Sequence, residues 1–282
     1  MCCAGGCFYA LNAPISKLLL GRVSPSMMAA FLYLGCGFGM AIVQLAGTGR
    51  ESHEERLTKM DLPYTLAMIV LDIAAPIALM LGLERSSAES AALLNNFEIV
   101  ATSLIALLIF KERISKHLWV GIGLVTLSSA ILSTRGAGGV SLSVGSLFIL
   151  LACVCWGFEN NCTRALSSKS PLQIVVVKGI FSGLGALLVA LISGEAFPTA
   201  ADVVGTMFLG FVAYGLSILF YIYSQRELGA ARTSAYYAIA PFVGVLLSWV
   251  IFREAPTVSF LIALVIMIAG TIMVTKDAAE SE

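Results

Sequence analysis

The sequence predicts an all-α integral membrane protein with ten transmembrane helices, arranged as two inverted repeats of five helices each. Three observations predict this fold class. The chain of 282 residues is 59% hydrophobic and only 12% charged, which leaves too few polar groups to cover the surface of a soluble protein. Its apolar runs have the length of bilayer-spanning helices, roughly 17 to 25 residues each. The third observation is an internal duplication that relates the two halves of the chain.

Ten apolar runs of spanning length are separated by short polar breaks, which cannot themselves lie in hydrocarbon. The runs fall near residues 1–20, 25–47, 62–84, 88–110, 116–134, 142–163, 171–194, 200–224, 231–252 and 256–274. The longest break, Arg50 to Asp61, is rich in charged residues and predicts a solvated loop. We expect residues 1–134 to form the first repeat, 135–141 a linker, 142–276 the second repeat and 277–282 a cytoplasmic tail.

The duplication is clearest between residues 84–112 and 226–254. Both segments lead from a polar turn into small residues, and they end on Phe110-Lys111-Glu112 and Phe252-Arg253-Glu254. They are identical at only five of twenty-nine aligned positions. The inference therefore rests on the matching order of the flanking segments.

Other segments of the two halves align in the same order. Tyr9-Ala10 in the first run corresponds to Trp156-Gly157 in the sixth, and Pro25, Gly37 and Gly39 in the second correspond to Pro171, Gly183 and Gly185 in the seventh. We interpret the glycines as positions of close helix packing and not as site residues. Because five is an odd number of spans, the second repeat begins on the opposite side of the membrane, an architecture typical of transporters.

The basic residues in the breaks predict the orientation, because short loops rich in Lys and Arg stay in the cytoplasm. With both termini inside, eleven basic residues are cytoplasmic: Arg50, Arg56, Lys59, Lys111, Arg113, Lys116, Arg164, Lys169, Arg226, Arg232 and Lys276. Five lie outside: Lys17, Arg22, Arg85, Arg135 and Arg253. We therefore expect a multi-pass protein of the cell membrane with cytoplasmic N- and C-termini.

Taken together, these features resemble the drug/metabolite transporter superfamily with two EamA-type repeats, over essentially the whole chain. The resemblance rests on Ser87-Ala88 and Gly229-Ala230, the two Phe-basic-Glu ends, Pro241, Trp156-Gly157, and Pro171 followed by Lys178. It implies a multi-pass carrier that exports a small metabolite, amino acid or drug. The chain departs from the family pattern in two places: Ile99 follows Glu98 where proline is common, and the second span lacks a basic residue like Lys178.

Four ionisable residues within the spans are the first candidates for a functional site: Asp72, Glu98, Glu159 and Lys178. A charged side chain at the bilayer centre costs a few kcal/mol on insertion scales, so such residues normally face a wet cavity or a partner. By helical rise, Glu159 and Lys178 lie at similar depths. Two interpretations stay open for this pair, a structural ion pair or a substrate-carboxylate site at Lys178.

Polar residues form two further stripes at helical spacing: Asn95, Glu98 and Thr102 share one face, and Trp156, Asn160 and Thr163 share another. Under the repeat alignment, Asp72 corresponds to Tyr214 and Asn95 to Tyr237. We expect a midplane cavity with carboxylates on one wall and aromatic hydroxyls on the other, suited to an amphipathic organic solute. The alternative is that Tyr214, Tyr221 and Tyr237 only form hydrogen bonds between helices.

The sequence thus predicts a secondary carrier that exports a small organic metabolite by proton antiport. Glu98 is the expected acid, which binds either a proton or the solute, and Asp72 is the reserve. Three alternatives are a facilitative carrier without proton coupling, a permanently protonated structural Glu98, and a structural membrane subunit. A fourth is a membrane-embedded lipid-modifying enzyme, and the lack of paired Asp clusters for a metal and a diphosphate argues against it.

Few other partners are expected. The chain has no ATP-binding loop, and its seven cysteines show no paired metal spacing, so we expect neither cofactor nor metal. Net charge is zero and there is no basic patch, which gives no reason to expect nucleic acid. Compared with the sixth run, the first is shorter before its aligned residue, so we expect about six residues of the first helix to be lost or altered.

Overall fold

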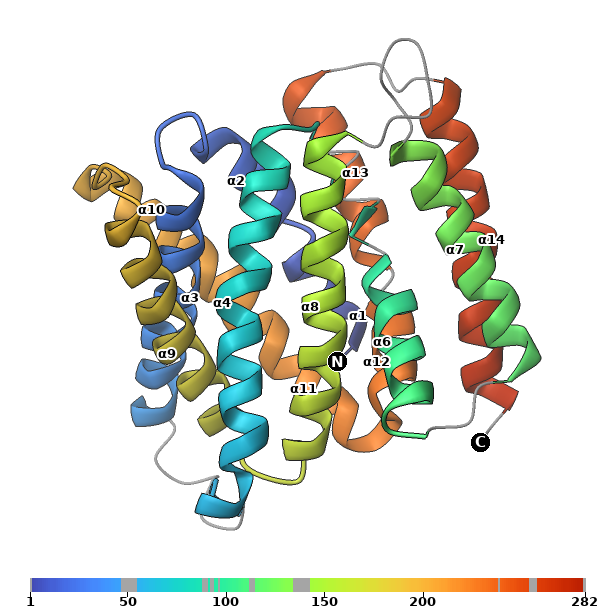
Figure 1. Ribbon diagram of the computed structural model, residues 1–282, viewed down its shortest axis with the longest axis horizontal. Helices are drawn as coiled ribbons and strands as arrows, with labels where there is room; N and C mark the ends of the chain where they lie inside the picture. Colours follow the sequence, from blue (N-terminus) through green and yellow to red (C-terminus); the bar gives the residue numbers. More distant parts are fainter. Residues whose placement is uncertain are drawn as a thin grey trace.

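The computed structural model describes residues 2–46, 55–87, 91, 94–95, 97–111, 115–133, 143–237, 239–253 and 258–280. Within these residues every regular element is helical, and the helices pass up and down through one bundle (Figure 1). The predicted all-helical fold class is confirmed. The predicted linker at 135–141 lies outside the described residues, as do Ala88, Glu112 and Glu254.

Ten helical segments correspond, in the described parts of the chain, to the ten predicted spans. Those of the first repeat are α1 (Cys2–Tyr9) with α2 (Asn12–Leu19), α3 (Pro25–Ala46), α4 (Leu62–Glu84) preceded by the short η1 (Lys59–Asp61), α6 (Phe97–Leu108) and α7 (Lys116–Ser133). Those of the second are α8 (Val144–Leu166), α9 (Pro171–Ile192), α10 (Ala200–Gly210) with η2 (Phe211–Leu216) and α11 (Ser217–Leu228), α12 (Ala230–Tyr237) with α13 (Ile239–Phe252), and α14 (Val258–Glu280).

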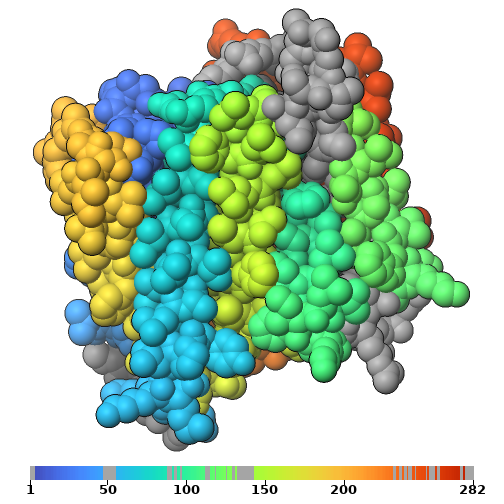
Figure 2. Space-filling model, in the orientation of Figure 1, coloured from blue at the N-terminus to red at the C-terminus, as the bar shows by residue number. Residues whose placement is uncertain are grey.

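The outer surface of the bundle is apolar. Among the described residues, five helical segments are long and apolar enough to cross a bilayer, namely α3, η1–α4, α8, α9 and α10–η2–α11, and shorter apolar stretches lie in α6, α7 and α14. Large hydrophobic side chains such as Leu45, Ile192 and Val250 are more than 70% exposed. Figure 2 shows α4, α8, α6 and α7 forming one continuous face. Such exposed apolar area is stable only when lipid covers it.

The first predicted span is broken rather than continuous, and proline explains the break. It divides at Ala10–Leu11 into α1 and α2. Pro14 lies four residues after Ala10. Because proline has no backbone N–H, Pro14 cannot donate the helical hydrogen bond to the Ala10 carbonyl. The expectation of a continuous first helix was wrong at this point.

Other spans also differ from the prediction. In the fourth, Asn95 lies in a turn between the helical Leu94 and α6, although no proline follows Glu98. The eighth contains a π-helical turn, η2, which is a local irregularity frequent at functional sites. In the tenth, α14 continues to Glu280, past the predicted end at 274, so residues 277–280 of the predicted tail are helical.

The backbone supports the duplication. Lys111 and Arg253, which are equivalent in the two repeats, adopt left-handed conformations with φ of 56° and 53°. Each follows the C-terminal end of its helix, where such a residue closes the last turn. The equivalent helices α3 and α9 run antiparallel, as inversion requires: Glu195 beyond the end of α9 accepts a bond from the Met27 amide near the start of α3, and Leu57 beyond α3 donates to Gln173 near the start of α9.

Glycines bring α3 and α9 into backbone contact. A Cβ atom on Gly37 would lie 2.5 Å from the backbone nitrogen of Ile180, and one on Gly183 would lie 2.7 Å from that of Leu34. Neither position has room for a side chain. The interpretation of these glycines as packing residues is confirmed, and the contact joins the first repeat to the second.

One end of the bundle, here called the basic end, carries Lys59, Lys169 and Arg226 near the turns that join helices. The predicted solvated loop before α4 begins to be described at Glu55, where it packs on the α8–α9 turn: the Ser170 amide donates to the Glu55 carbonyl over 2.8 Å. Lys169 also donates to the Glu55 carboxylate, which lowers the pKa of that carboxyl group. The pair is too exposed to contribute much stability.

Candidate functional site

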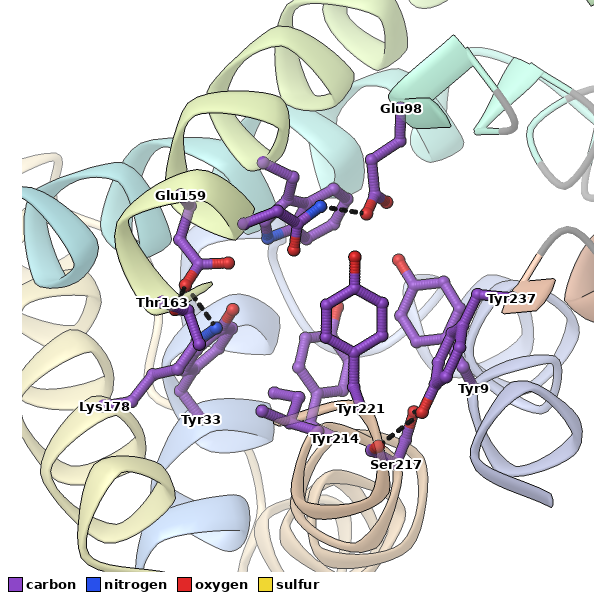
Figure 3. A pocket seen from close by; sticks show the side chains of 13 residues that line it. Tyr9, Tyr33, Glu98, Glu159, Thr163, Lys178, Tyr214, Ser217, Tyr221 and Tyr237 are labelled. Atoms are coloured by element: carbon purple, nitrogen blue, oxygen red, sulfur yellow. Dashed lines mark hydrogen bonds and ion pairs between the residues drawn. The ribbon is translucent and has the colours of Figure 1, made fainter. Parts of the chain in front are cut away.

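The repeats enclose a central pocket of about 60 Å³ near the middle of the bundle (Figure 3). From the first repeat, Tyr9, Tyr33 and Glu98 line it. From the second repeat come Trp156, Glu159, Asn160, Thr163, Lys178, Tyr214, Ser217, Ile218, Tyr221 and Tyr237. A pocket at the interface of inverted repeats, beside a broken helix, is where secondary carriers bind their solutes.

Glu98 is held at the edge of the pocket by a neutral donor. The amide nitrogen of Asn160 on α8 donates to Glu98 Oε1 over 2.7 Å and lies 3.1 Å from the Thr102 hydroxyl. The two predicted polar stripes on α6 and α8 therefore face one another. Within the described chain, no Lys or Arg lies within ion-pair distance of Glu98. Its charge is thus not neutralised by a basic side chain there.

Lys178 forms the centre of a buried charged triad. Its ammonium nitrogen lies 2.8 Å from Glu159 Oε1 and 3.2 Å from Asp72 Oδ2, and all three side chains are at most 4% exposed. Thr163 donates a further bond to Glu159, and the Tyr33 hydroxyl donates to Asp72 Oδ1 over 2.7 Å. The triad joins α4 of the first repeat to α8 and α9 of the second. Buried charges of this kind require such partners, because an unpaired one is strongly destabilising.

Aromatic side chains make up most of the remaining wall. The ring of Tyr214, on the π-turn η2, packs edge-on against Tyr33 at 5.0 Å and against Tyr9 at 6.0 Å, and Tyr9 packs against Trp156 at 6.4 Å. Tyr221 and Tyr237 meet at 4.6 Å. Figure 3 shows Glu98 and Glu159 approaching from one side, and Tyr214 and Tyr221 from the other.

Each of the three predicted tyrosines also has a hydrogen-bond partner on another helix. Asn12 donates to the Tyr214 hydroxyl over 3.2 Å. The Tyr221 hydroxyl lies 2.6 Å from that of Ser234, and Tyr237 donates to the Ser217 carbonyl. The predicted alternative of bonds between helices is therefore present, and it coexists with a position on the pocket wall.

Two further cavities lie among the described residues. Toward the basic end, a vestibule of about 340 Å³ lies between α8 and α11 and includes Asn161, Arg164, Gln225 and Arg226. Toward the other end, a small cavity of about 30 Å³ is lined by Tyr9, Asn12, Leu79, Asn95 and Gly244, among others. Tyr9 borders both this cavity and the central pocket, and its hydroxyl accepts a bond from Asn95 over 3.0 Å.

Seven of the nine predicted site residues line the central pocket: Glu98, Trp156, Glu159, Asn160, Lys178, Tyr214 and Tyr237. Asp72 does not line it but contacts it through Lys178, and Asn95 lies in the smaller cavity behind Tyr9. From the sequence we considered an ion pair of Lys178 with Glu159 and placed Asp72 near Glu98 instead. The structure places Asp72 on Lys178, since α4 packs between α8 and α9.

Six residues that line the pocket were not among the predicted site residues: Tyr9, Tyr33, Thr163, Ser217, Ile218 and Tyr221. Tyr33, together with Asn12 behind the wall, makes bonds that hold the site. Tyr33 is 1% exposed and bonds Asp72, and Asn12 bonds Tyr214. The available signal was chemical: each is a polar group within a long apolar run, and such groups require a partner when buried. In the repeat alignment Tyr33 corresponds to Gly179 and so has no polar counterpart, whereas Asn12 corresponds to Glu159. The repeat therefore carried a signal for Asn12 but none for Tyr33.

Comparison with known proteins agrees with this architecture. The model of the EamA-like transporter family matches residues 1–134 and 143–276. An uncharacterized transporter of Methanothermobacter thermautotrophicus is 24% identical over 287 residues, covering 93% of this chain and 81% of the relative. The uncharacterized transporter YyaM of Bacillus subtilis is 23% identical over 246 residues, covering 84% and 80%. A solved structure, 16% identical, superposes with a TM-score of 0.75 over 99% of this chain and 96% of that one, which supports the fold.

The family match extends over both repeats and so covers nearly all of the chain. It identifies a multi-pass membrane transporter and sets aside the lipid-modifying enzyme considered from the sequence. The ten-span bundle, the inverted helices α3 and α9 and the pocket between the repeats are the structural features expected of such a carrier. The chain belongs to the EamA-like transporter family.

Proposed function

We propose that the protein exports a small organic metabolite from the cytoplasm across the cell membrane, in exchange for protons. The observation that supports this most directly is the position of Glu98, a carboxylate on the wall of a pocket between the two repeats, with an amide as its neighbour and no basic partner among the described residues. Such a group is free to bind a proton or a solute in turn.

The orientation rests on charge and on access. The basic end is cytoplasmic in this proposal, because short loops rich in Lys and Arg stay inside. The larger vestibule, about 340 Å³, opens from that same end, whereas the cavity on the far side measures about 30 Å³. Asn160 lines the central pocket and the adjacent Asn161 lines the vestibule. These positions support access to the central pocket from the cytoplasmic side.

Antiport follows from competition at Glu98. Solute arriving from the cytoplasm displaces the proton, and after the pocket has opened to the outside, a proton from there displaces the solute. Contacts between the repeats at α3–α9 and at the Lys178 triad are well suited to remain rigid, because they are formed by close backbone packing and by buried ion pairs. The region around Tyr9, where α1 ends and Asn95 interrupts the fourth span, is better suited to move.

The experiment is transport by the purified protein in vesicles. Solute counterflow, screened over amino acids and small organic cations, identifies a transported solute. Export is then compared with and without a pH gradient for the wild type, for Glu98→Gln and for the control Glu84→Gln, which removes an exposed carboxylate at the end of α4.

Glu98→Gln keeps hydrogen bonding but cannot titrate. We expect it to retain exchange between compartments of equal pH and to lose acceleration by a pH gradient, while Glu84→Gln behaves as the wild type. Unchanged gradient-driven transport by Glu98→Gln would remove Glu98 from the mechanism and favour the structural acid bonded to Asn160. No effect of a pH gradient on the wild type would favour a facilitative carrier.

A further inference from the structure

The charges around the central pocket do not balance. Its described lining includes two carboxylates, Glu98 and Glu159, and a single cationic side chain, Lys178. A third carboxylate, Asp72, lies directly behind Lys178. When all four groups are ionised, the three negative charges exceed the one positive charge by two. A net negative field in a pocket of low polarity attracts cations and repels anions.

Lys178 is not available to a substrate carboxylate. Its ammonium is 4% exposed and already contacts one oxygen of Glu159 at 2.8 Å and one of Asp72 at 3.2 Å. An incoming carboxylate would bring a third negative charge to this single ammonium and would separate it from a buried partner, which is strongly unfavourable. The triad therefore removes the one group through which an acid or a zwitterion would be recognised.

Glu98, by contrast, has unused capacity. A carboxylate has two oxygens and about four acceptor positions. The bond from Asn160 reaches only Oε1. An ammonium group placed beside Glu98 would gain a charge-assisted hydrogen bond and would neutralise a partly buried charge.

The rest of the wall also suits a cation. Six aromatic side chains line the pocket: Tyr9, Tyr33, Trp156, Tyr214, Tyr221 and Tyr237. The face of an aromatic ring attracts a cation, and the attraction is larger where water is excluded. A volume of about 60 Å³ holds about four water molecules, which is the size of a small head group rather than of a whole drug. The rings then provide an apolar surface for the part of the solute next to the charge.

We infer that the central pocket recognises an organic cation, a small aromatic or aliphatic amine without a carboxylate, with its ammonium beside Glu98. This inference rests on the proposed function, in that it takes the central pocket to be the solute site. It goes further by excluding amino acids and organic acids as the preferred class. Cations are favoured over acids because Lys178 already contacts two carboxylates, whereas Glu98 has no basic partner among the described residues.

The test compares three probes that share one aromatic skeleton. Phenethylamine carries only the ammonium, phenylalanine carries both charges and 3-phenylpropionate carries only the carboxylate. Binding to the purified full-length protein is followed by Trp156 fluorescence, in a background where the exposed Trp119 and Trp249 are replaced by Phe. We expect phenethylamine to bind at least tenfold more tightly than either of the other probes.

Variants at Glu98 and Glu84 test whether the Glu98 carboxylate binds the ammonium group. Glu98→Gln should weaken phenethylamine binding at least tenfold, whereas Glu84→Gln, which removes the same charge outside the pocket, should not. Glu98→Asp keeps the charge on a shorter side chain and should give an intermediate affinity. Unfolding temperatures of the same samples report whether each variant is folded, and the comparison of the three probes on the background protein needs no change at Glu98.

The inference is overturned if phenylalanine or 3-phenylpropionate binds as tightly as phenethylamine, if none of the three binds, or if folded Glu98→Gln retains the affinity for the amine. These outcomes are distinct from failure of the proposed function. If the protein exchanges phenylalanine for protons, the antiport mechanism stands and the inference of a cationic solute is wrong. If the amine binds tightly but a pH gradient has no effect on transport, the inference of a cationic solute stands and proton coupling is ruled out.

Discussion

Asn160 Nδ2 lies 2.7 Å from Glu98 Oε1, so an uncharged amide on α8 holds the carboxylate of α6. The bond connects the second repeat to the first at the edge of the central pocket. We expect a double-mutant cycle of Asn160→Ala and Glu98→Ala, measured by unfolding in detergent, to give a coupling free energy of about 0.5–1.5 kcal/mol, the range for hydrogen bonds between membrane helices. A coupling of zero would mean that the two side chains do not interact in the folded protein.

The Lys178 triad predicts a graded recovery of stability. Lys178→Met leaves two buried carboxylates facing each other, and removal of one partner from a buried ion pair costs about 3–5 kcal/mol. Adding Glu159→Gln should restore part of the loss, and adding Asp72→Asn as well should restore most of the remainder, because both uncompensated charges are then gone. The measurement is the free energy of unfolding of the four proteins in one detergent.

Additive losses across that series would argue against the pairing seen at 2.8 Å and 3.2 Å. They would return Lys178 to the role of a substrate ligand, the interpretation that the sequence left open. The cation inference would then lose its main premise, so the same series also checks it independently of any solute.

Close packing of α3 against α9 predicts a large cost for a single methyl group. In Gly37→Ala the new Cβ would lie 2.5 Å from the nitrogen of Ile180, and the backbones must separate. We expect a loss of stability of about 1–3 kcal/mol, as for overpacking in other cores. The matched control is Gly123→Ala in α7, where no atom lies within 4 Å of the new Cβ. That change should be neutral or slightly stabilising, since alanine favours helix.

Glu195 predicts a pH dependence of stability. Burial acts to raise the pKa of this carboxyl group, but bonds from the Ser24 hydroxyl and the Ser26 and Met27 amides outweigh it, and the pKa in the folded protein is lowered. The carboxylate therefore stabilises the fold above the pKa of an unfolded glutamate, about 4.3, and this contribution is lost as the pH falls through the lower folded-state value.

Glu195→Gln should accordingly lower the unfolding temperature at pH 7, and its difference from the wild type should shrink as the medium is acidified below pH about 4. Thermal unfolding in detergent across this range is the measurement. Glu84→Gln serves as the control, because the Glu84 carboxylate is 43% exposed and pairs with the neighbouring Arg85 side chain rather than with a helix N-terminus. A difference that stays constant with pH would show that Glu195 does not cap α3 through its charge.

Much of the architecture could be predicted from the sequence, because a segment that crosses a bilayer must be apolar, long enough to span it and internally hydrogen-bonded. Apolar runs of spanning length located the ten spans, and the equivalence of Phe110-Lys111 with Phe252-Arg253 indicated a duplication that the shared left-handed backbone at Lys111 and Arg253 supports. Burial cost also singled out Asp72, Glu98, Glu159 and Lys178, since ionisable groups in hydrocarbon require partners.

Only the tertiary structure decided which of these groups are partners. Spacing along a helix gives depth and face, but not the rotation of one helix against its neighbours, so the third member of the triad, Asp72, could not be assigned to Lys178. The break at Ala10–Leu11 follows from Pro14, which the sequence contained and the span prediction did not use. The charge imbalance that favours a cation exists only because packing brings Asp72 and Glu159 to one ammonium and leaves Glu98 with an amide.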